Sequence, residues 1–264
     1  MEKKMLVSDL DGTLLKNDKT VSQETIDTLL EFKRNGNEIL FATARAPRDA
    51  YRLIPKELID NPVICYNGAC ISKQNKEIIY KKQLSKENII KILQIVKEFG
   101  YDKIGFEIND EFFVNFDPTD FFGVTPNTPM DLDKFEFTSA YKILVCSKTP
   151  LEMKLKEKLD EFSKAIITDN GSLCQIMNKE VSKWSCIESI MKQKNISSKN
   201  IMAFGDDHND YEMIKNAGVG VAMGNAEDRI KKIADFVTDT NMNNGVANFV
   251  KNYEKFYEAE LLEI

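Results

Sequence analysis

Two aspartates one residue apart, Asp9 and Asp11, are the residues whose types and spacing most clearly suggest chemistry. They follow a short apolar segment and precede Gly12, so a chain that leaves a strand into a glycine turn can spread both carboxylates around one point. Two such acids can hold a divalent cation through oxygen ligands. One can also attack an electrophile while the other moves a proton. The alternative without function is a solvated Asp-x-Asp-Gly turn.

A second acidic cluster lies far downstream, in residues 205–210 (GDDHND), and again follows an apolar segment. Between the two clusters lie residues 41–45 (FATAR) and the pair Ser182-Lys183. Together with residues 9–13 (DLDGT), these segments resemble the four motifs of the haloacid dehalogenase superfamily of phosphohydrolases. The resemblance covers nearly the whole chain and is strongest to the Cof-type branch, which carries a cap domain between the second and third motifs.

This resemblance implies catalysis through an aspartyl-phosphate. Asp9 would be the nucleophile that attacks phosphorus, and Asp11 would protonate the leaving alcohol and then deprotonate the hydrolytic water. Mg²⁺ would offset the repulsion between phosphate and carboxylates. The expected metal site comprises Asp9, the Asp11 backbone carbonyl, Asp206 and Asp210, of which Asp210 would support the metal's waters or orient Lys183.

The same resemblance implies phosphate-binding groups on several motifs. Thr43 would offer its hydroxyl, and the turn that begins at Ala44 would offer backbone N–H groups. Lys183 would supply positive charge, so Thr43 and Lys183 also count as catalytic. Asn209 would donate a hydrogen bond to a phosphate oxygen, and Leu10 completes the predicted phosphate site.

Each of these assignments has a structural alternative. Asp206 and Asp210 could cap a helix, and Asn209 could simply begin one. Thr43 could be a β-branched residue at the end of a strand, and Lys183 could be one of many solvated lysines.

The chain departs from the family pattern at Ala44, where family members often have glycine, and at Trp184, where a small residue is usual. Trp184 could narrow the site entrance or pack beneath it. Arg45 could steer phosphate or pair with an acid. His208, the only histidine, is expected at the surface or behind the ligating residues.

The elements that must position these residues alternate between strands and helices at both ends of the chain. The predicted strands are 5–9, 38–43, 63–66, 201–204, 219–222 and 235–237. The predicted helices are 22–35, 47–54, 209–217, 225–233 and one after Lys183. Such alternation implies a parallel sheet with ligands beyond the carboxyl ends of its strands, where Asp9, Thr43 and Asp206 fall.

The middle of the chain has a different pattern. An amphipathic helix over 85–99 precedes a hairpin of 103–108 and 112–116, and a strand over 141–146 follows. A capping box at 149–152 predicts a helix to about residue 163, followed by strands over 165–168 and 173–177. Five aromatic residues could line a substrate cleft or form the core of this region, and core is the better interpretation. They are Phe112, Phe113, Phe116, Phe121 and Phe122. The polar side chains of this region that could contact a substrate, called possible polar readers below, are Glu107, Asn115 and Asp117.

We therefore predict two domains in an α/β protein. A Rossmann-like parallel-sheet core, as in the haloacid dehalogenase superfamily, comprises residues 1–82 and 183–264. An inserted α/β cap, residues 83–182, would determine substrate specificity, with hinges near 80–84 and 178–184.

Composition excludes several other classes of protein. The chain has 264 residues, and its 36 basic and 42 acidic residues give a net charge of −6, which argues against a broad nucleic-acid or anionic-membrane surface. No apolar run approaches the roughly 20 residues needed to span a bilayer, and the N-terminus lacks a signal-peptide pattern. Five dispersed cysteines indicate reduced thiols in a cytoplasmic protein.

The sequence thus predicts a cytoplasmic, Mg²⁺-dependent phosphatase, that is, a phosphoric monoester hydrolase. Its substrates would be small phosphorylated metabolites such as sugar phosphates or nucleotide-like cofactors, and it would act as a monomer or weak homo-oligomer. A phosphomutase-type phosphotransferase is the main alternative. A non-catalytic phosphometabolite-binding protein is a further one, against which the intact pair Asp9 and Asp11 argues.

Overall fold

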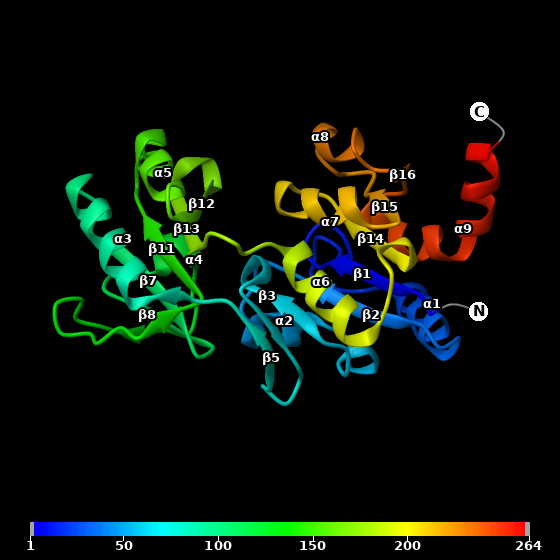
Figure 1. Ribbon diagram of the computed structural model, residues 1–264, viewed down its shortest axis with the longest axis horizontal. Helices are drawn as coiled ribbons and strands as arrows, with labels where there is room; N and C mark the ends of the chain where they lie inside the picture. Colours follow the sequence, from blue (N-terminus) through cyan, green and yellow to red (C-terminus); the bar gives the residue numbers. More distant parts are fainter. Residues whose placement is uncertain (1–2, 262–264) are drawn as a thin grey trace. The chain divides into compact units, whose positions relative to one another are not determined.

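The computed structural model describes residues 3–261, with side chains described to residue 253 (Figure 1). The chain divides into two compact units. The core unit comprises residues 1–80 and 182–264, and the cap unit comprises residues 81–181. Among the described residues, no helix has the length and apolar character required to cross a bilayer.

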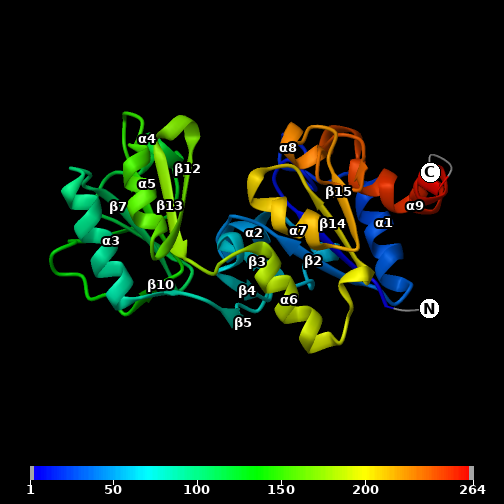
Figure 2. The same ribbon diagram turned by 45° about the horizontal axis from the view of Figure 1, so that its top comes forward.

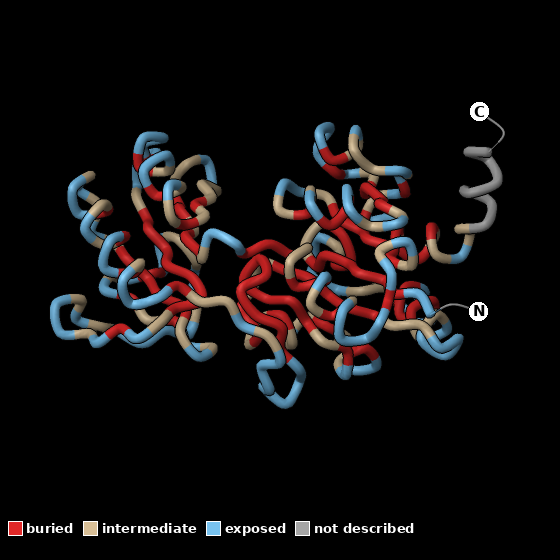
Figure 3. Tube along the Cα trace, in the orientation of Figure 1, coloured by how far each residue is buried: buried red, intermediate tan, exposed pale blue. Residues whose placement is uncertain are grey.

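The core unit is built on an eight-stranded sheet in the order β16-β15-β14-β1-β2-β3-β4-β5 (Figures 1 and 2). Its strands are β1 (Met5–Asp9), β2 (Glu38–Ala42), β3 (Val63–Cys65), β4 (Cys70–Ser72), β5 (Ile78–Lys81), β14 (Ile201–Gly205), β15 (Val219–Ala222) and β16 (Phe236–Val237). From β16 to β3 the neighbours are parallel, whereas β4 pairs antiparallel with β3. Every residue of β1 and β14 is buried, as expected for a parallel sheet covered on both faces (Figure 3). The predicted α/β fold is confirmed.

Helices connect these strands. They are α1 (Gln23–Arg34), α2 (Pro47–Leu53), α6 (Lys183–Lys194), α7 (Tyr211–Asn216), α8 (Asp228–Lys231) and α9 (Gly245–Leu261). Helix α1 packs against α9, and α6 packs against α7. The predicted start of α1 is confirmed, because the Ser22 side chain accepts a hydrogen bond from the Thr25 N–H. Gly36 follows the helix with φ +84°, a conformation that glycine adopts without strain.

Strand order explains why distant motifs meet. Asp9 is the last residue of β1, Thr43 follows β2 and Asp206 follows β14. In the sheet, β1 lies between β14 and β2 and runs parallel to both. The three residues therefore emerge at one edge of the sheet, although almost 200 positions separate the first from the last.

The cap unit has a six-stranded sheet in the order β12-β13-β11-β7-β8-β9. Its strands are β7 (Lys103–Ile108), β8 (Glu111–Val114), β9 (Thr128–Pro129), β11 (Lys142–Cys146), β12 (Ser163–Thr168) and β13 (Leu173–Asn178). Helices α3 (Lys86–Glu98) and α5 (Met153–Asp160) contact each other, and a two-stranded sheet joins β6 (Leu84–Ser85) to β10 (Ser139–Ala140). The short helix α4 is Thr119–Phe122.

The aromatic residues of the cap belong to its own core. Phe112 lies in a buried cluster against which Phe116, Phe121 and Phe122 pack, whereas Phe113 packs into the cluster formed with α3 and α5. Alternation along β8 explains why neighbouring phenylalanines enter different clusters. The interpretation of these residues as core is confirmed.

Two of the possible polar readers serve the local backbone. The Asn115 side chain accepts from the Ile104 N–H and donates to the Asp102 carbonyl. Asp117 accepts from the Thr119 N–H at the start of α4. The third, Glu107, is buried in β7.

The predicted capping box at residues 149–152 is wrong. Helix α5 begins at Met153 with Glu152 as its N-cap, and it ends at Asp160 rather than near residue 163. The preceding segment is used elsewhere, because the Leu151 N–H donates to the Gly171 carbonyl at 2.8 Å and Leu151 itself is buried. Tertiary pairing with the turn between β12 and β13 therefore overrides the local helix signal.

Candidate active site

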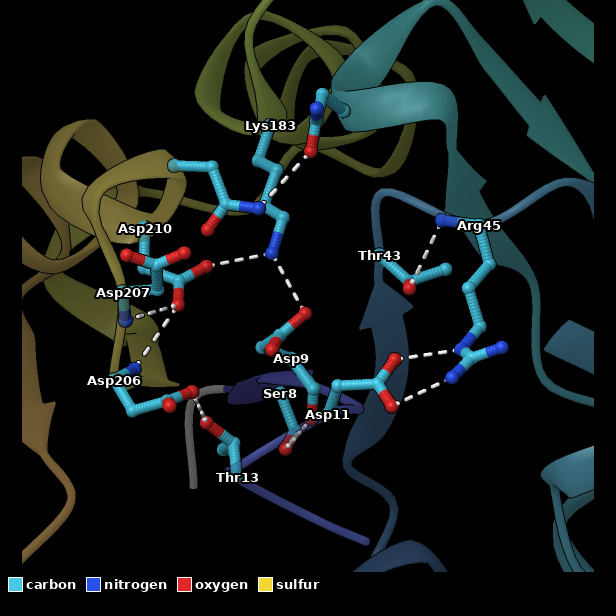
Figure 4. Close-up of polar contacts among 12 residues, drawn as sticks. Ser8, Asp9, Asp11, Thr13, Thr43, Arg45, Lys183, Asp206, Asp207 and Asp210 are labelled. Carbon is cyan, nitrogen blue, oxygen red and sulfur yellow. Dashed lines mark hydrogen bonds and ion pairs between the residues drawn. The ribbon is translucent and has the colours of Figure 1, made fainter. Parts of the chain in front are cut away.

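The centre of the candidate site is an ammonium group between two carboxylates. Lys183 Nζ donates to Asp9 Oδ1 at 2.7 Å and to Asp210 Oδ1 at 2.6 Å (Figure 4). Lys183 is 1% exposed because it is the first residue of α6 and extends into the core unit. Burial alone would lower the pKa of Lys183, but the ion pairs with Asp210 and Asp9 outweigh it and raise the pKa. The lysine is therefore a permanent cation, not a solvated surface lysine.

Asp210 also fixes the loop that follows β14. Its Oδ2 accepts from the backbone N–H groups of Asp206 at 3.0 Å and Asp207 at 3.2 Å. Asp207 is the N-cap of the short helix η5 (His208–Asp210), and Asp210 closes the capping box. The capping alternative is thus correct for Asp210 in part, since one oxygen caps and the other binds Lys183. The Asp206 side chain caps no helix in the described part of the chain and binds Thr13 instead.

Asp206 faces the first motif. Its Oδ1 accepts from Thr13 Oγ1 at 2.8 Å (Figure 4). A Cβ on Gly12 would lie 2.2 Å from its Oδ2. Gly12 has φ +76°, so glycine is required there by both conformation and space. Burial raises the pKa of Asp206 to about 7, with Asp210 adding to the shift and Thr13 opposing it.

Asp9, the candidate nucleophile, also has a perturbed pKa. Burial raises the pKa of Asp9 well above its usual range, Lys183 opposes the shift, and the carboxylates of Asp210 and Asp206 add to it. Ligand oxygens of Asp9, Asp206 and Asp210 lie within 4.8 Å of one another. One lysine does not offset three crowded acids, so the oxygen-rich donor set suits a hard divalent cation such as Mg²⁺.

The carboxylate of Asp11 lies apart from this cluster. It turns towards Arg45, whose Nε and Nη2 donate to it at 2.6 and 2.8 Å (Figure 4). Lys19 Nζ also donates to this carboxylate, at 2.7 Å. Burial would raise the pKa of Asp11, but the hydrogen bonds from Arg45 and Lys19 outweigh it and lower the pKa. Of the two roles left open for Arg45, pairing with an acid is the one observed.

The predicted phosphate-binding residues of the first and second motifs lie where strands end. Thr43 is 1% exposed, and its Oγ1 accepts from the Arg45 N–H at 3.2 Å, so the turn through Ala44 is closed by the threonine itself. Leu10 is buried between the two aspartates, and its carbonyl accepts from the N–H groups of Thr13 and Leu15.

Asn209 belongs to η5, and its side chain contacts Asn67, a residue after β3 to which the motifs assign no role. Its Nδ2 donates to Asn67 Oδ1 at 3.0 Å. His208 beside it is exposed, in agreement with the expected surface position, and Trp184 is partly buried next to Lys183.

Sequence reasoning missed three residues at this site: Thr13, Lys19 and Asn67. Thr13 carries a detectable signal, because it sits inside the first motif directly after the glycine turn. Asn67 had a weaker one, an Asn-Gly dipeptide after a strand. Lys19 carries none, since its ion pair with Asp11 depends on a loop residue held at φ 65°.

The arrangement of Asp9, Asp11 and the buried Lys183 agrees with a comparison against known protein families. A model of the haloacid dehalogenase-like hydrolases matches residues 6–250 of the chain. The chain belongs to this family.

This haloacid dehalogenase-like hydrolase has relatives that are named as phosphatases. The 5-amino-6-(5-phospho-D-ribitylamino)uracil phosphatase YitU of Bacillus subtilis is 28% identical, with 94% of this chain and 97% of the relative covered. The pyridoxal phosphate phosphatase YbhA of Escherichia coli is 25% identical, with 96% and 99% covered.

A solved structure agrees with these relatives. A phosphatase of the haloacid dehalogenase superfamily from Bacteroides thetaiotaomicron is 28% identical over 96% of this chain and 95% of its own, with a TM-score of 0.84. The hydrolase described here is accordingly a phosphatase, and this part of the prediction is confirmed.

Proposed function

We propose that this phosphatase hydrolyses small phosphorylated metabolites through an aspartyl-phosphate on Asp9, with Mg²⁺ as cofactor. The observation that carries the proposal is the position of Asp9, whose Oδ1 is held by Lys183 beside Asp206 and Asp210. The substrate class is supported by relatives named for 5-amino-6-(5-phospho-D-ribitylamino)uracil and for pyridoxal phosphate.

In the proposed reaction Asp9 attacks phosphorus, and Lys183 offsets negative charge as the phosphoryl group is transferred. Asp11 donates a proton to the leaving oxygen and then accepts one from the attacking water. The oxygens of Asp9 and Asp206 and the Asp11 carbonyl would hold Mg²⁺. Bound there, the ion would neutralise phosphate charge and orient the phosphoryl group.

Asp210 has a different proposed role. Both of its oxygens accept hydrogen bonds from the protein, so it orients Lys183 and the loop and reaches the metal through waters. Thr43 and the backbone after it, together with Leu10 and Asn209, are proposed to contact the phosphoryl oxygens.

The test is phosphate release from a panel of phosphomonoesters, with and without Mg²⁺, for the wild type and Asp9→Asn. We expect metal-dependent turnover that the substitution abolishes, and the ranking of the esters would identify the substrate class. Isomerised product with little free phosphate would favour a phosphomutase. Phosphate binding by folded protein without turnover of any ester would favour a binding protein.

A further inference from the structure

A short segment between β3 and β4 links several motifs of the active site. This segment, η2 (Tyr66–Gly68), receives no role from the proposed reaction. Its Tyr66 and Asn67 N–H groups donate to the carbonyls of Arg45 and Thr43, both at 3.0 Å. The Cys186 thiol of α6, the helix that begins with Lys183, donates to the Gly68 carbonyl at 3.0 Å.

The backbone of this segment is held in an uncommon conformation. Tyr66 and Asn67 have φ of 53° and 59°, in the left-handed region where asparagine is among the better-tolerated residues. Gly68 has φ 109°, and a Cβ there would lie 2.0 Å from the Ser182 carbonyl oxygen. Conformational strain of this kind persists where the surrounding structure fixes it and is concentrated at functional sites. The Asn67 side chain is consequently placed by the second and third motifs together.

Asn67 uses this placement to hold Asn209. Asn67 is 5% exposed, and its Oδ1 accepts from Asn209 Nδ2 at 3.0 Å. The other end of the Asn209 amide, Oδ1, is buried and has no hydrogen-bond partner among the described residues. A primary amide has a donor end and an acceptor end, so one end of Asn209 is held by Asn67 and the other is open to a ligand.

We propose that Asn67 is a positioning residue that acts through Asn209 to bind the transferring phosphoryl group. A phosphoryl oxygen accepts hydrogen bonds, so Asn209 must present its NH₂ to it. If the side-chain amide groups of Asn67 and Asn209 flip together, Asn209 Oδ1 accepts from Asn67 Nδ2. The hydrogen bond between the two side chains is then kept, and Asn209 Nδ2 faces the phosphoryl group. The Asn67 amide can serve as acceptor before binding and as donor afterwards, because it carries both kinds of group. This inference rests on the proposed function.

Asn67→Gly separates positioning from a purely structural role, because glycine keeps the left-handed backbone and removes only the amide. Asn244→Gly is the matched control, since Asn244 also has φ 59° and a buried amide oxygen without a partner but binds Glu24 at an exposed position. The experiment measures kcat, KM and inhibition by inorganic phosphate for the wild type, Asn67→Gly, Asn209→Ala, their double variant and Asn244→Gly.

We expect Asn67→Gly to lower kcat/KM and phosphate affinity about tenfold, the size of one lost hydrogen bond to a charged group. The double variant should match Asn209→Ala within about twofold, because coupled residues are not additive. Asn244→Gly should behave as the wild type. Wild-type values for Asn67→Gly, or losses that multiply in the double variant, would overturn the inference.

Asn67→Asp is a second variant. Aspartate also tolerates the left-handed backbone conformation, but its ionised side chain can only accept hydrogen bonds. It should fix the Asn209 carbonyl towards the phosphate and weaken phosphate binding more than Asn67→Gly does, and unchanged binding would contradict the inference. If the wild type releases no phosphate from any ester, the proposed function fails. Calorimetry with inorganic phosphate and Mg²⁺ would still decide the role of Asn67.

Discussion

At the scale of single residues, the site holds three acidic side chains close together, and the positive charge of Lys183 only partly offsets them. Lys183 is shared by Asp9 and Asp210, whereas among the described side chains the Asp206 carboxylate receives a hydrogen bond only from the Thr13 hydroxyl. The cost appears as raised pKa values for Asp9 and Asp206. A divalent cation would relieve this cost, which links metal affinity to pH.

The pKa of Asp206, about 7 against an ordinary value of 3.8, gives the first prediction. Between about pH 4 and pH 7 the folded, metal-free protein retains a proton that the unfolded chain releases, so the free energy of unfolding falls as pH rises through this window. Mg²⁺ binds the ionised carboxylates and should raise the melting temperature more at pH 8 than at pH 5.

Melting curves in EDTA and in Mg²⁺ at both pH values provide the measurement. Asp206→Asn is the matched control, because it cannot ionise and should lose most of the Mg²⁺ effect together with part of the pH dependence. Equal Mg²⁺ effects at pH 5 and pH 8 in the wild type would contradict this linkage.

The two cations on Asp11 give a second prediction. Arg45→Met removes two hydrogen bonds that lower the pKa of Asp11 and leaves the burial that raises it. Because the proposed hydrolysis step needs ionised Asp11 as a base, the acidic limb of the pH profile of kcat should move to higher pH. Lys19→Met removes one hydrogen bond and should move the limb less. An unmoved limb in Arg45→Met would rule out this role for the pair.

At the scale of elements, short turns after strands place the charged groups. The turn after β1 brings Gly12 against Asp206, and the loop after β14 is closed by hydrogen bonds to Asp210. These turns tolerate few residue types because backbone of one motif meets side chains of another.

Gly12→Ala should therefore remove activity as well as stability. The φ of +76° costs an alanine about 1–2 kcal/mol, and its Cβ would displace Asp206 from its position 2.2 Å away. Gly36→Ala is the control with φ +84° and no atom within 4 Å, so it should show only the backbone cost and full activity. Chemical denaturation and kcat/KM of both variants distinguish the two effects. Equal kcat/KM in the two alanine variants would show that Asp206 does not need this space.

At the scale of the whole molecule, each unit has a hydrophobic core of its own. The cap sheet packs against α3 and α5 around residues such as Phe106. Phe106 is fully buried, stacks against Phe135 and contacts Phe137 in a tilted arrangement. The core unit is organised instead by the parallel strands that end at the active site. We propose that the two units unfold as separate cooperative bodies.

Phe106→Ala tests this separation. Loss of the buried ring should cost the cap unit about 3–5 kcal/mol. Hydrogen exchange should then accelerate in β7, β11 and α3, while β1 and β14 keep their protection. Equal loss of protection in β1 would mean that the two units unfold together.

Much of the fold and of the site could be predicted from local sequence, with instructive exceptions. Ser22 begins α1 as expected because its cap is completed within three residues. The false helix start at residues 149–152 had an equally good local signal, but Leu151 pairs with Gly171 instead. Lys19 and Asn67 were missed because their partners, Asp11 and Asn209, are chosen by tertiary contacts.

The sequence by itself determined the alternation of strands and helices, the order of the motifs and the residue types that chemistry requires, because these depend on periodicity and on neighbours within a few positions. Only the tertiary structure decided which charges meet. In the folded chain Lys183 forms ion pairs with both Asp9 and Asp210. Asp11 pairs with Arg45, and Asn67 accepts a hydrogen bond from Asn209. Strand order in the parallel sheet is the physical reason, since it joins residues far apart in the chain at one edge, where burial and charge then fix their partners.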